Sequence, residues 1–407
     1  MNKSTQEFIQ QHINDDVLQL GLQRTKYPDV DYPLAIRQIS GRQKFKKKVP
    51  QFYDHPEILF PIQLSVEQAS SEITAKYKSE LVSGRIFVDL TGGFGVDFFF
   101  LSNKFENGIY VERDNQLCEL AIHNFKALGI NGFEVCHQNA EDYIPIMPEV
   151  DLIYLDPHRR NDSGKKTVCI SDCEPDVSIL IKILLSKSSE IMIKLSPMLD
   201  IRQAINDIPQ TSEIHVLAVE NECKEILLIL KKQIQKEEMV VEKNEIIIKT
   251  LNFLKNGNRQ QFDFQIDEEV VNETSYTSSP LQYLYEPNAA IMKSGAFKSI
   301  GARFGLKKFH PNTHLYTDNT LKADFPGRIF SVHHIAGNTK EDFKSLKLGF
   351  PKANISVRNY PLSVEEYKKK SGIKDGGDDY IFAFKVNDGN LINIVAKKTN
   401  LTSLNEF

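Results

Sequence analysis

One short stretch of the sequence combines a carboxylate with three groups that can carry positive charge. It follows the mainly apolar segment 151–155 ("DLIYL") and consists of Asp156, Pro157, His158, Arg159 and Arg160. A carboxylate at the end of a buried strand can accept hydrogen bonds from a ligand, and neighbouring arginines favour a polyanionic partner. A β-turn with solvated arginines would use the same residues, so the rest of the chain has to distinguish the two interpretations.

A glycine-rich segment lies upstream, where an earlier apolar run ends. In "VDLTGGFGVD" (88–97), the candidate cofactor contacts are Asp89, Thr91, Gly92, Gly93, Gly95 and Asp97. Glycine lets the backbone turn tightly and approach a ligand, as it also does in phosphate-binding loops. A carboxylate would repel a pyrophosphate, whereas it would attract an ammonium or sulfonium group. A tight turn that starts a helix explains the glycines but not both acids.

Polar residues also follow the next two apolar runs. Glu112 ends the second run and is followed by Arg113, and an acid at this place can accept hydrogen bonds from ribose hydroxyls. Asn139 and Ala140 follow the third run, and the Asn139 amide can both donate and accept at the edge of a base. We expect these four residues to contact a cofactor that contains a nucleoside.

Two flanking segments could complete the site. Lys194 lies near the end of the run 190–196 and is a candidate substrate contact, although a lysine at a strand end is more often solvated. In "EQASSEITAKYK" (67–78), Gln68, Ser70 and Ser71 could line the site or could equally belong to an ordinary polar helix surface.

The elements that must position these residues alternate along the chain. Segments with helical spacing separate the β-rich runs 85–90, 108–114, 133–138, 151–156 and 190–196. This alternation predicts right-handed βαβ units and an open parallel sheet. The carboxyl ends of parallel strands meet at one edge, so the candidate residues should gather there.

The end of this block follows another pattern. The runs 213–220 and 225–232 are separated only by "NECK" (221–224), and four residues are too few for a parallel crossover. The two runs must form a hairpin, with the last strand antiparallel. This arrangement resembles class I S-adenosylmethionine-dependent methyltransferases and not dinucleotide dehydrogenases. The resemblance implies an α/β fold with a seven-stranded Rossmann-like sheet, and S-adenosyl-L-methionine as the cofactor.

Most of the chain resembles the bacterial class I methyltransferases that carry a C-terminal THUMP-like domain. The resemblance rests on "GRQKFKKKVP", "DLTGGFGVD", "LDPHRR", "KLSPMLD" and "YLYEPNAAIMKSG". In methyltransferases that act on exocyclic amines, an Asp-Pro pair orients the acceptor nitrogen. The resemblance implies this catalytic role for Asp156 and Pro157, with His158 and Arg159 beside them. This family often has alanine where His158 stands, so His158 is a departure from its pattern.

Four domains are expected along the chain. They are an N-terminal helical, basic segment (1–63), the methyltransferase domain (64–235), a connecting ferredoxin-like module (236–326) and a THUMP-like domain (327–407). The connecting module should contain a hairpin over 245–267, and the last segment has a βαβαββ pattern. THUMP domains in related enzymes bind structured RNA, so the resemblance implies RNA, as rRNA or tRNA, as the substrate.

Positive charge gathers at residues 37–48, which include six Lys or Arg and no acid. Such a run is usually a solvated helix end, although it could also contact a phosphate backbone. The candidate substrate-binding residues are Arg160, Lys194, Arg42, Lys46 and Lys47. A second basic cluster comprises Lys293, Lys298, Arg303, Lys307 and Lys308.

The composition agrees with a multidomain globular protein: 407 residues, 41% hydrophobic and 26% charged. No apolar run approaches the roughly 20 residues that span a bilayer, and the first residues have no signal-peptide core. Five scattered cysteines indicate a reducing compartment, and their spacing fits no metal site. We therefore expect a cytoplasmic protein with neither a membrane nor a metal partner.

The sequence leaves three functions open. We expect an RNA methyltransferase, but the same cofactor site could serve a protein or small-molecule acceptor. A third possibility is an RNA-binding protein whose methyltransferase fold no longer catalyses. Turnover that survives RNase treatment would indicate the second function, and RNA binding that is insensitive to Asp156→Ala would indicate the third.

Overall fold

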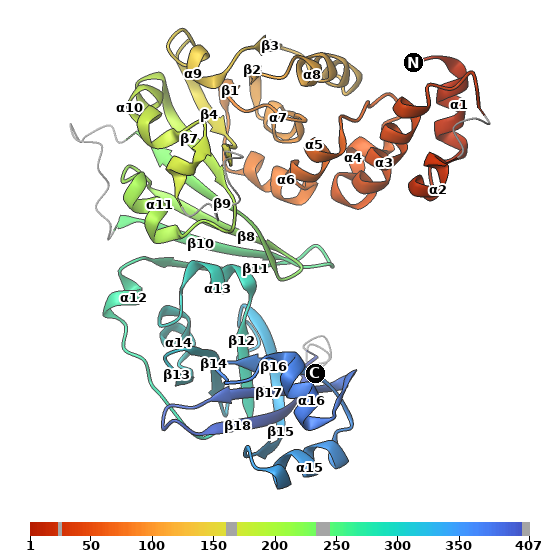
Figure 1. The fold of residues 1–407 in the computed structure, drawn as a ribbon. Helices are drawn as coiled ribbons and strands as arrows, with labels where there is room; N and C mark the ends of the chain where they lie inside the picture. Colours follow the sequence, from red (N-terminus) through yellow and green to blue (C-terminus); the bar gives the residue numbers. More distant parts are fainter. Residues whose placement is uncertain (23–26, 160–168, 233–244, 401–407) are drawn as a thin grey trace, which may run out of the picture. The chain divides into compact units, whose positions relative to one another are not determined.

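The computed structural model describes residues 1–22, 27–159, 169–232 and 245–400 (Figure 1). The chain divides into two compact units. The first unit comprises residues 1–212 and 226–241, and the second comprises residues 213–225 and 242–407.

The N-terminal segment is helical, as the sequence predicted. Polar side chains begin its first helices, because Asn2, Asp16 and Asp31 each accept a backbone N–H of the first turn. The helices are α1 (Lys3–Gln11), α2 (Val17–Gly21), α3 (Tyr32–Lys48), α4 (Pro50–Asp54), α5 (Gln63–Gln68) and α6 (Glu72–Glu80).

A large mixed sheet carries the predicted α/β fold. Its strands are β1 (Gly84–Asp89), β2 (Phe105–Glu112), β3 (Phe133–His137), β4 (Val150–Leu155), β7 (Ser188–Leu195), β8 (Glu213–Val219), β9 (Glu222–Lys231), β10 (Ile247–Phe253) and β11 (Arg259–Gln265). Their order across the sheet is β11-β10-β8-β9-β7-β4-β1-β2-β3. Strands β3, β2, β1, β4 and β7 are mutually parallel, which confirms the predicted βαβ units.

The antiparallel last strand is confirmed, because β9 pairs antiparallel with β7. The predicted strand count of seven was wrong, since the described sheet contains nine strands. The expected hairpin at 245–267 forms β10 and β11, and β10 pairs in parallel with β8 over Ile247–Phe253. An unpaired sheet edge exposes a row of backbone N–H and C=O groups, and β10 satisfies those of β8.

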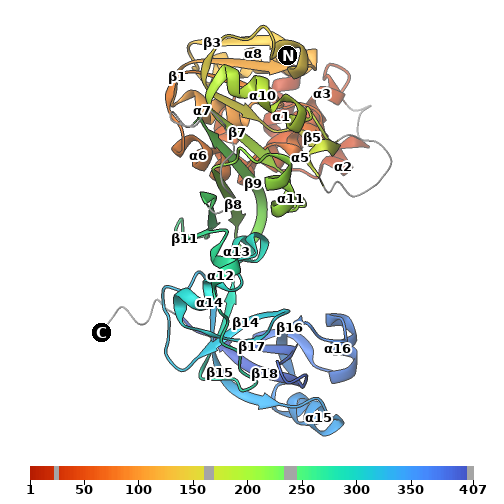
Figure 2. The same ribbon diagram turned by 90° about the vertical axis from the view of Figure 1, so that its left-hand side faces the viewer.

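Helices cover both faces of this sheet. Helices α7 and α8 pack on β2, whereas α10 packs on β7. Figures 1 and 2 show α10 and α11 on the opposite face of the sheet from α7 and α8. The helices are α7 (Val96–Ser102), α8 (Asn115–Ala127), α9 (Ala140–Tyr143), α10 (Val177–Lys187) and α11 (Ile201–Asp207).

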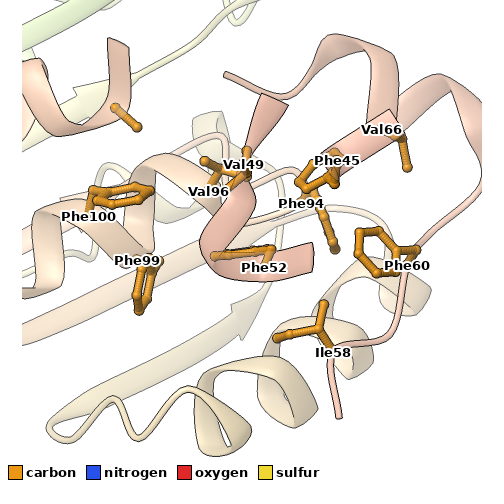
Figure 3. Packing of buried hydrophobic residues seen from close by; sticks show 11 residues of the cluster. Phe45, Val49, Phe52, Ile58, Phe60, Val66, Phe94, Val96, Phe99 and Phe100 are labelled. Carbon is orange, nitrogen blue, oxygen red and sulfur yellow. The ribbon is translucent and has the colours of Figure 1, made fainter. Parts of the chain in front are cut away.

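An aromatic cluster joins the N-terminal helices to the glycine-rich loop (Figure 3). Phe45 of α3 and Phe52 of α4 pack against Phe94, which lies in that loop. The ring centroids of Phe45 and Phe94 are 5.2 Å apart, and those of Phe52 and Phe94 are 5.6 Å apart. Phe45 and Phe52 are fully buried, so the cluster provides a rigid support for the loop.

The second unit has its own sheet of seven strands, in the order β13-β14-β12-β15-β18-β17-β16. The strands are β12 (Tyr283–Pro287), β13 (Lys307–His310), β14 (Thr313–Asp318), β15 (Gly327–Ala336), β16 (Lys352–Arg358), β17 (Lys374–Lys385) and β18 (Leu391–Lys398). The helices of this unit are α12 (Glu268–Val271), α13 (Ala289–Ser294), α14 (Ser299–Phe304), α15 (Lys340–Gly349) and α16 (Val364–Ser371).

The βαβαββ pattern of the last segment is confirmed by β15-α15-β16-α16-β17-β18. β12 pairs antiparallel with both β14 and β15. The expected connecting and THUMP-like segments therefore share one continuous sheet. In the part of the chain that the structure describes, no helix has the length and apolar character needed to cross a membrane.

Candidate active site

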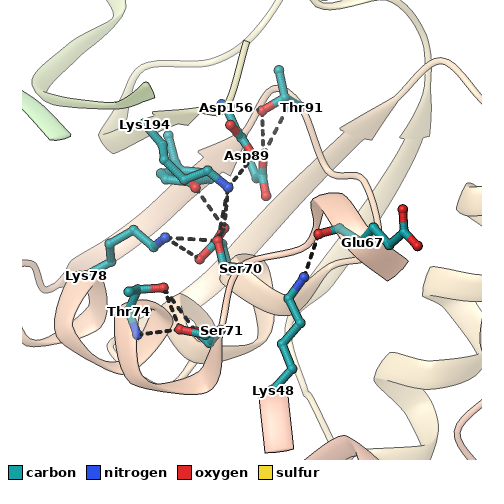
Figure 4. A network of polar contacts seen from close by, with 12 residues as sticks. Lys48, Glu67, Ser70, Ser71, Thr74, Lys78, Asp89, Thr91, Asp156 and Lys194 are labelled. Atoms are coloured by element: carbon teal, nitrogen blue, oxygen red, sulfur yellow. Dashed lines mark hydrogen bonds and ion pairs between the residues drawn. The ribbon is translucent and has the colours of Figure 1, made fainter. Parts of the chain in front are cut away.

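Three residues link the carboxyl ends of β1 and β4. The backbone N–H of Asp156 donates to the hydroxyl Oγ1 of Thr91 over 2.6 Å. The backbone N–H of Thr91 donates to Oδ1 of Asp89 over 3.0 Å (Figure 4). These contacts bring together Asp156 and two of the candidate cofactor residues, at the edge where the parallel strands end.

The glycine-rich loop is shaped by the rings beneath it. A Cβ atom on Gly92 would lie 2.2 Å from the Tyr110 ring, and one on Gly95 would lie 2.8 Å from the Phe125 ring. Gly93 and Gly95 also have positive φ angles, of 57° and 79°. The glycines are therefore required by packing and backbone conformation, in addition to the ligand approach expected from the sequence.

Glu112 holds the same loop from the end of β2. Its Oε2 accepts the N–H of Gly93 over 2.9 Å, and its Oε1 accepts the N–H of Asp114 over 2.9 Å. A carboxylate oxygen can accept more than one hydrogen bond, so Glu112 retains acceptor capacity for a ligand hydroxyl. Asn139 directly precedes α9, and the side-chain amide of Asn139 donates a hydrogen bond to Asp142. Ala140, the first residue of α9, is buried.

A buried network of charges surrounds Asp97, in the first turn of α7. Its Oδ1 lies 2.9 Å from Nζ of Lys78, and its Oδ2 accepts hydrogen bonds from Ser70 over 2.6 Å and Tyr154 over 2.8 Å. Nζ of Lys194 lies 3.8 Å from the same Oδ2. Lys78 has no exposed surface, and Asp97 and Lys194 are each 8% exposed.

Lys194 connects this network to Asp156. Its Nζ lies 2.5 Å from Oδ2 of Asp156 and donates to the Ser70 hydroxyl over 3.0 Å. The network thus runs from Lys78 through Ser70 and Asp97 to Lys194, and ends at the carboxylate of Asp156.

The two buried aspartates of the site differ in proton affinity. Burial acts to raise the pKa of Asp97, but the ammonium groups of Lys78 and Lys194 and the hydrogen bond from Ser70 lower it to about 2. Burial raises the pKa of the Asp89 carboxyl well above its usual range. Asp89 therefore protonates far more readily than Asp97.

Two residues after Asp156 belong to a short antiparallel pair of strands. His158 and Arg159 make up β5, which pairs with β6 (Cys173–Glu174). Arg113 donates to Nε2 of His158 over 2.7 Å and lies 2.9 Å from Glu174. Two predicted site residues, Arg113 directly after β2 and His158 on β5, are therefore in direct contact. Arg160 lies outside the described residues.

The basic residues of α3 make contacts of a different kind. The guanidinium of Arg42 donates to four backbone carbonyls, those of Tyr53, His55, Pro56 and Ile58. Burial lowers the pKa of Arg42. Arg42 thus fastens the end of α4 and the segment after it, whereas the side chains of Lys46 and Lys47 are exposed.

A crystal structure from Porphyromonas gingivalis, described as that of a methyltransferase, is similar to almost the whole chain. The similarity covers 97% of this chain and 98% of that one, with 32% sequence identity and a TM-score of 0.87. The chain belongs to this methyltransferase family.

Other comparisons cover parts of the methyltransferase. Two uncharacterised S-adenosylmethionine-dependent methyltransferases from strains of Mycobacterium tuberculosis are each 19% identical over 251 residues. The match spans 61% of this chain and 62%, less than two thirds, of each relative. Residues 283–326 match a model of a ferredoxin-like domain, and residues 327–398 match one described as THUMP domain-like.

The carboxylates of the site suit the cofactor of this methyltransferase, S-adenosylmethionine. Three carboxylates near Asp89 act with its burial to raise its pKa, and they belong to Asp97, Asp156 and Glu112. The cofactor carries a sulfonium and an ammonium group against one carboxylate, so its net positive charge would relieve this repulsion. Asp89 would hold the cationic end and Glu112 the ribose hydroxyls, and the bound cofactor would supply an electrophilic methyl group.

Sequence reasoning missed Lys78, Tyr154 and Glu174. The first could have been found, because Thr74 and Lys78 are four residues apart on α6 and both are buried. That spacing places polar side chains on one face of a helix, an unusual arrangement for a face turned to a sheet. Tyr154 and Glu174 carry no such signal in the sequence.

Proposed function

We propose that the chain methylates a nitrogen atom of an RNA base, with Asp156 and Pro157 orienting the acceptor. The observation that carries the proposal is the placement of Asp156. Its N–H is held by Thr91, beside the glycine-rich loop, and its carboxylate lies at the edge where β1 and β4 end. Methyl donor and acceptor would therefore meet beside this carboxylate.

The role of the carboxylate follows from the geometry of methyl transfer. An amine nitrogen attacks in line with the bond that breaks, so its lone pair must point at the methyl group. A carboxylate oxygen that accepts the amine N–H directs the lone pair away from itself. The same oxygen stabilises the positive charge that develops on nitrogen, and the nitrogen then releases a proton to water.

RNA as the acceptor is supported by the segment matched as THUMP domain-like, residues 327–398. The exposed Lys46 and Lys47 offer positive charge to phosphate groups in the first unit. Arg42 is not included, because its donors are occupied by backbone carbonyls.

The test uses S-adenosylmethionine labelled on its methyl group. The full chain is incubated with RNA, DNA and protein fractions from a strain that lacks it, and label is counted in each fraction. We expect label in RNA, and at least about a 100-fold lower rate for Asp156→Ala, because the acceptor would lose its alignment.

Other distributions of label would contradict the proposal. Label in the protein fraction that survives RNase treatment would assign a protein acceptor. RNA binding without label, unchanged by Asp156→Ala, would assign an RNA-binding protein that does not catalyse. Cofactor binding, measured calorimetrically for both forms, shows that a lost rate does not reflect a lost cofactor site.

A further inference from the structure

We propose that Lys194 is a positioning residue, whose ammonium fixes one carboxylate oxygen of Asp156 so that the other oxygen faces the acceptor. The sequence suggested Lys194 as a direct substrate contact. This inference rests on the proposed function, in which Asp156 is the residue that meets the acceptor nitrogen.

The strands place the two side chains together. In the pairing of β4 with β7, Leu155 lies opposite Ile193, so Asp156 and Lys194 each follow directly at the carboxyl end of the sheet. Nζ of Lys194 is 2.5 Å from Oδ2 of Asp156, so the two groups form a close ion pair with a charge-assisted hydrogen bond. Among the described residues, Oδ1 of Asp156 has no such partner, and the Asp156 side chain is 34% exposed.

The other contacts of Lys194 lie on the interior side. The Ser70 hydroxyl accepts from Lys194 over 3.0 Å and from Lys78 over 3.0 Å, and it donates to Asp97 over 2.6 Å. A hydroxyl donates one hydrogen bond and accepts two, so the bonding capacity of Ser70 is filled. Since every member is held by others, the Lys194 ammonium has a defined position before any ligand arrives.

Burial distinguishes positioning from substrate contact. Lys194 is 8% exposed, and its ammonium binds the carboxylate of Asp156. Lys194 therefore acts on the crevice through Asp156 and not by direct contact. A direct phosphate or base contact would require an exposed ammonium, as found for Lys46 and Lys47. Asp156 is constrained twice, at its N–H by Thr91 and at its carboxylate by Lys194. Two constraints on one residue are what precise orientation of an acceptor needs.

The experiment compares Lys194→Met with Lys194→Arg in the full chain. The assay is methyl transfer from labelled S-adenosylmethionine to total RNA from a strain that lacks the protein. Methionine keeps the length and apolar stem of lysine but removes the ammonium, whereas arginine restores a cation. We expect Lys194→Met to lower kcat about 100-fold, because the carboxylate is no longer held, with KM values and cofactor affinity changed less than about threefold. Lys194→Arg should recover part of kcat.

Lys249→Met serves as the matched control. Lys249 lies on β10 and pairs with Glu213 over 2.6 Å, so this variant removes an ion-paired lysine outside the site. Its kcat should equal that of the parent. If Lys194→Met does not fold, Ser70→Ala removes an anchor of Lys194 instead, and it should lower kcat in the same pattern to a smaller extent.

Three results would overturn the inference. These are an unchanged kcat in Lys194→Met or its substitute Ser70→Ala, a rise in the KM for RNA at constant kcat, and no recovery with arginine. A rise in the KM for RNA at constant kcat would indicate that Lys194 contacts the substrate. If Asp156→Ala were fully active, the proposed function itself would fail. The double variant Asp156→Ala/Lys194→Met separates the two, since positioning predicts no further loss beyond that of Asp156→Ala.

Discussion

The two units each bury a lysine, and they surround its ammonium differently. In the first unit, Lys78 meets the carboxylate of Asp97 and the hydroxyl of Ser70. In the second unit, Lys308 donates to the carbonyl of Pro311 and lies over aromatic rings. The rings are those of Phe297 and Tyr316, at 5.2 and 5.9 Å from Nζ.

The different surroundings of the two lysines are reflected in the pKa values of the groups at each site. Burial lowers the pKa of Lys308 to about 8, with Glu269 acting to raise it and the Lys298 ammonium to lower it. Around Lys78, the ammonium groups instead lower the pKa of Asp97 to about 2, despite its burial. The Asp97 carboxylate therefore stays ionised at neutral pH despite its burial, whereas burial favours the neutral form of Lys308.

The largest expected effect comes from removing the shared carboxylate. Asp97→Ala leaves the buried ammonium groups of Lys78 and Lys194 without their common counter-charge, which should lower the free energy of unfolding by about 3–5 kcal/mol. The pKa of Asp97 is lower in the folded chain than its ordinary 3.8. Its contribution is therefore present above pH 3.8 and is lost as the pH falls toward 2. Urea unfolding between pH 2 and 7 measures both effects.

Two variants serve as controls for this prediction. Asp29→Ala removes an exposed aspartate of the same unit and should change stability by less than about 0.5 kcal/mol. Asp97→Leu/Lys78→Met removes both charges of a buried pair and should recover part of the loss. A loss below about 1 kcal/mol in Asp97→Ala would remove the distinction between the two lysine sites.

A smaller effect is expected at Asp89, whose carboxylate has no lysine partner among the residues that the structure describes. Asp89→Asn should weaken binding of S-adenosylmethionine about tenfold and that of S-adenosylhomocysteine, which lacks the sulfonium charge, by less than threefold. The pKa of Asp89 is raised, so parent affinity for the charged ligand should fall as the pH is lowered toward that pKa. The variant should lack this fall. Calorimetric titration with both ligands from pH 5.5 to 8 tests this, and equal losses for the two ligands would contradict it.

The smallest effect is expected at the ring-lined site. Lys308→Met should change the free energy of unfolding at pH 7 by less than about 1 kcal/mol, because an apolar chain suits the rings. The folded pKa of Lys308, about 8, lies below the ordinary 10.5. Parent stability should therefore gain a contribution as the pH rises from 8 toward 10.5. Unfolding curves of Lys308→Met should lack this gain, whereas those of the exposed neighbour variant Lys307→Met should retain it.

The sheet was predictable because its signals are local. Alternating β-rich and helical runs gave the parallel strands, and the short "NECK" connection gave the antiparallel β9. The extra strands β10 and β11 were not predictable, because a hairpin carries no local sign of the sheet edge it will join. For the same reason, the sequence did not indicate that β12 and β15 pair in one sheet.

The candidate site was also predictable only in part. Strand ends gave the positions of Asp89, Glu112 and Asp156, since strand ends meet at one edge. Residue type did not distinguish a lysine that contacts a ligand from one that holds another side chain, as Lys194 shows. It also did not show that Arg42 would bind four carbonyls, because these partners depend on the path of the segment after α4.

The rings beneath the glycine-rich loop have a consequence for repeated turnover. Tyr110 and Phe125 occupy the space where Cβ atoms on Gly92 and Gly95 would lie, and the Tyr110 hydroxyl donates to the Gly93 carbonyl. The conformational entropy of this backbone is therefore lost once, during folding. Each exchange of spent cofactor for new cofactor meets a loop that is already ordered, so little binding energy is diverted to ordering it.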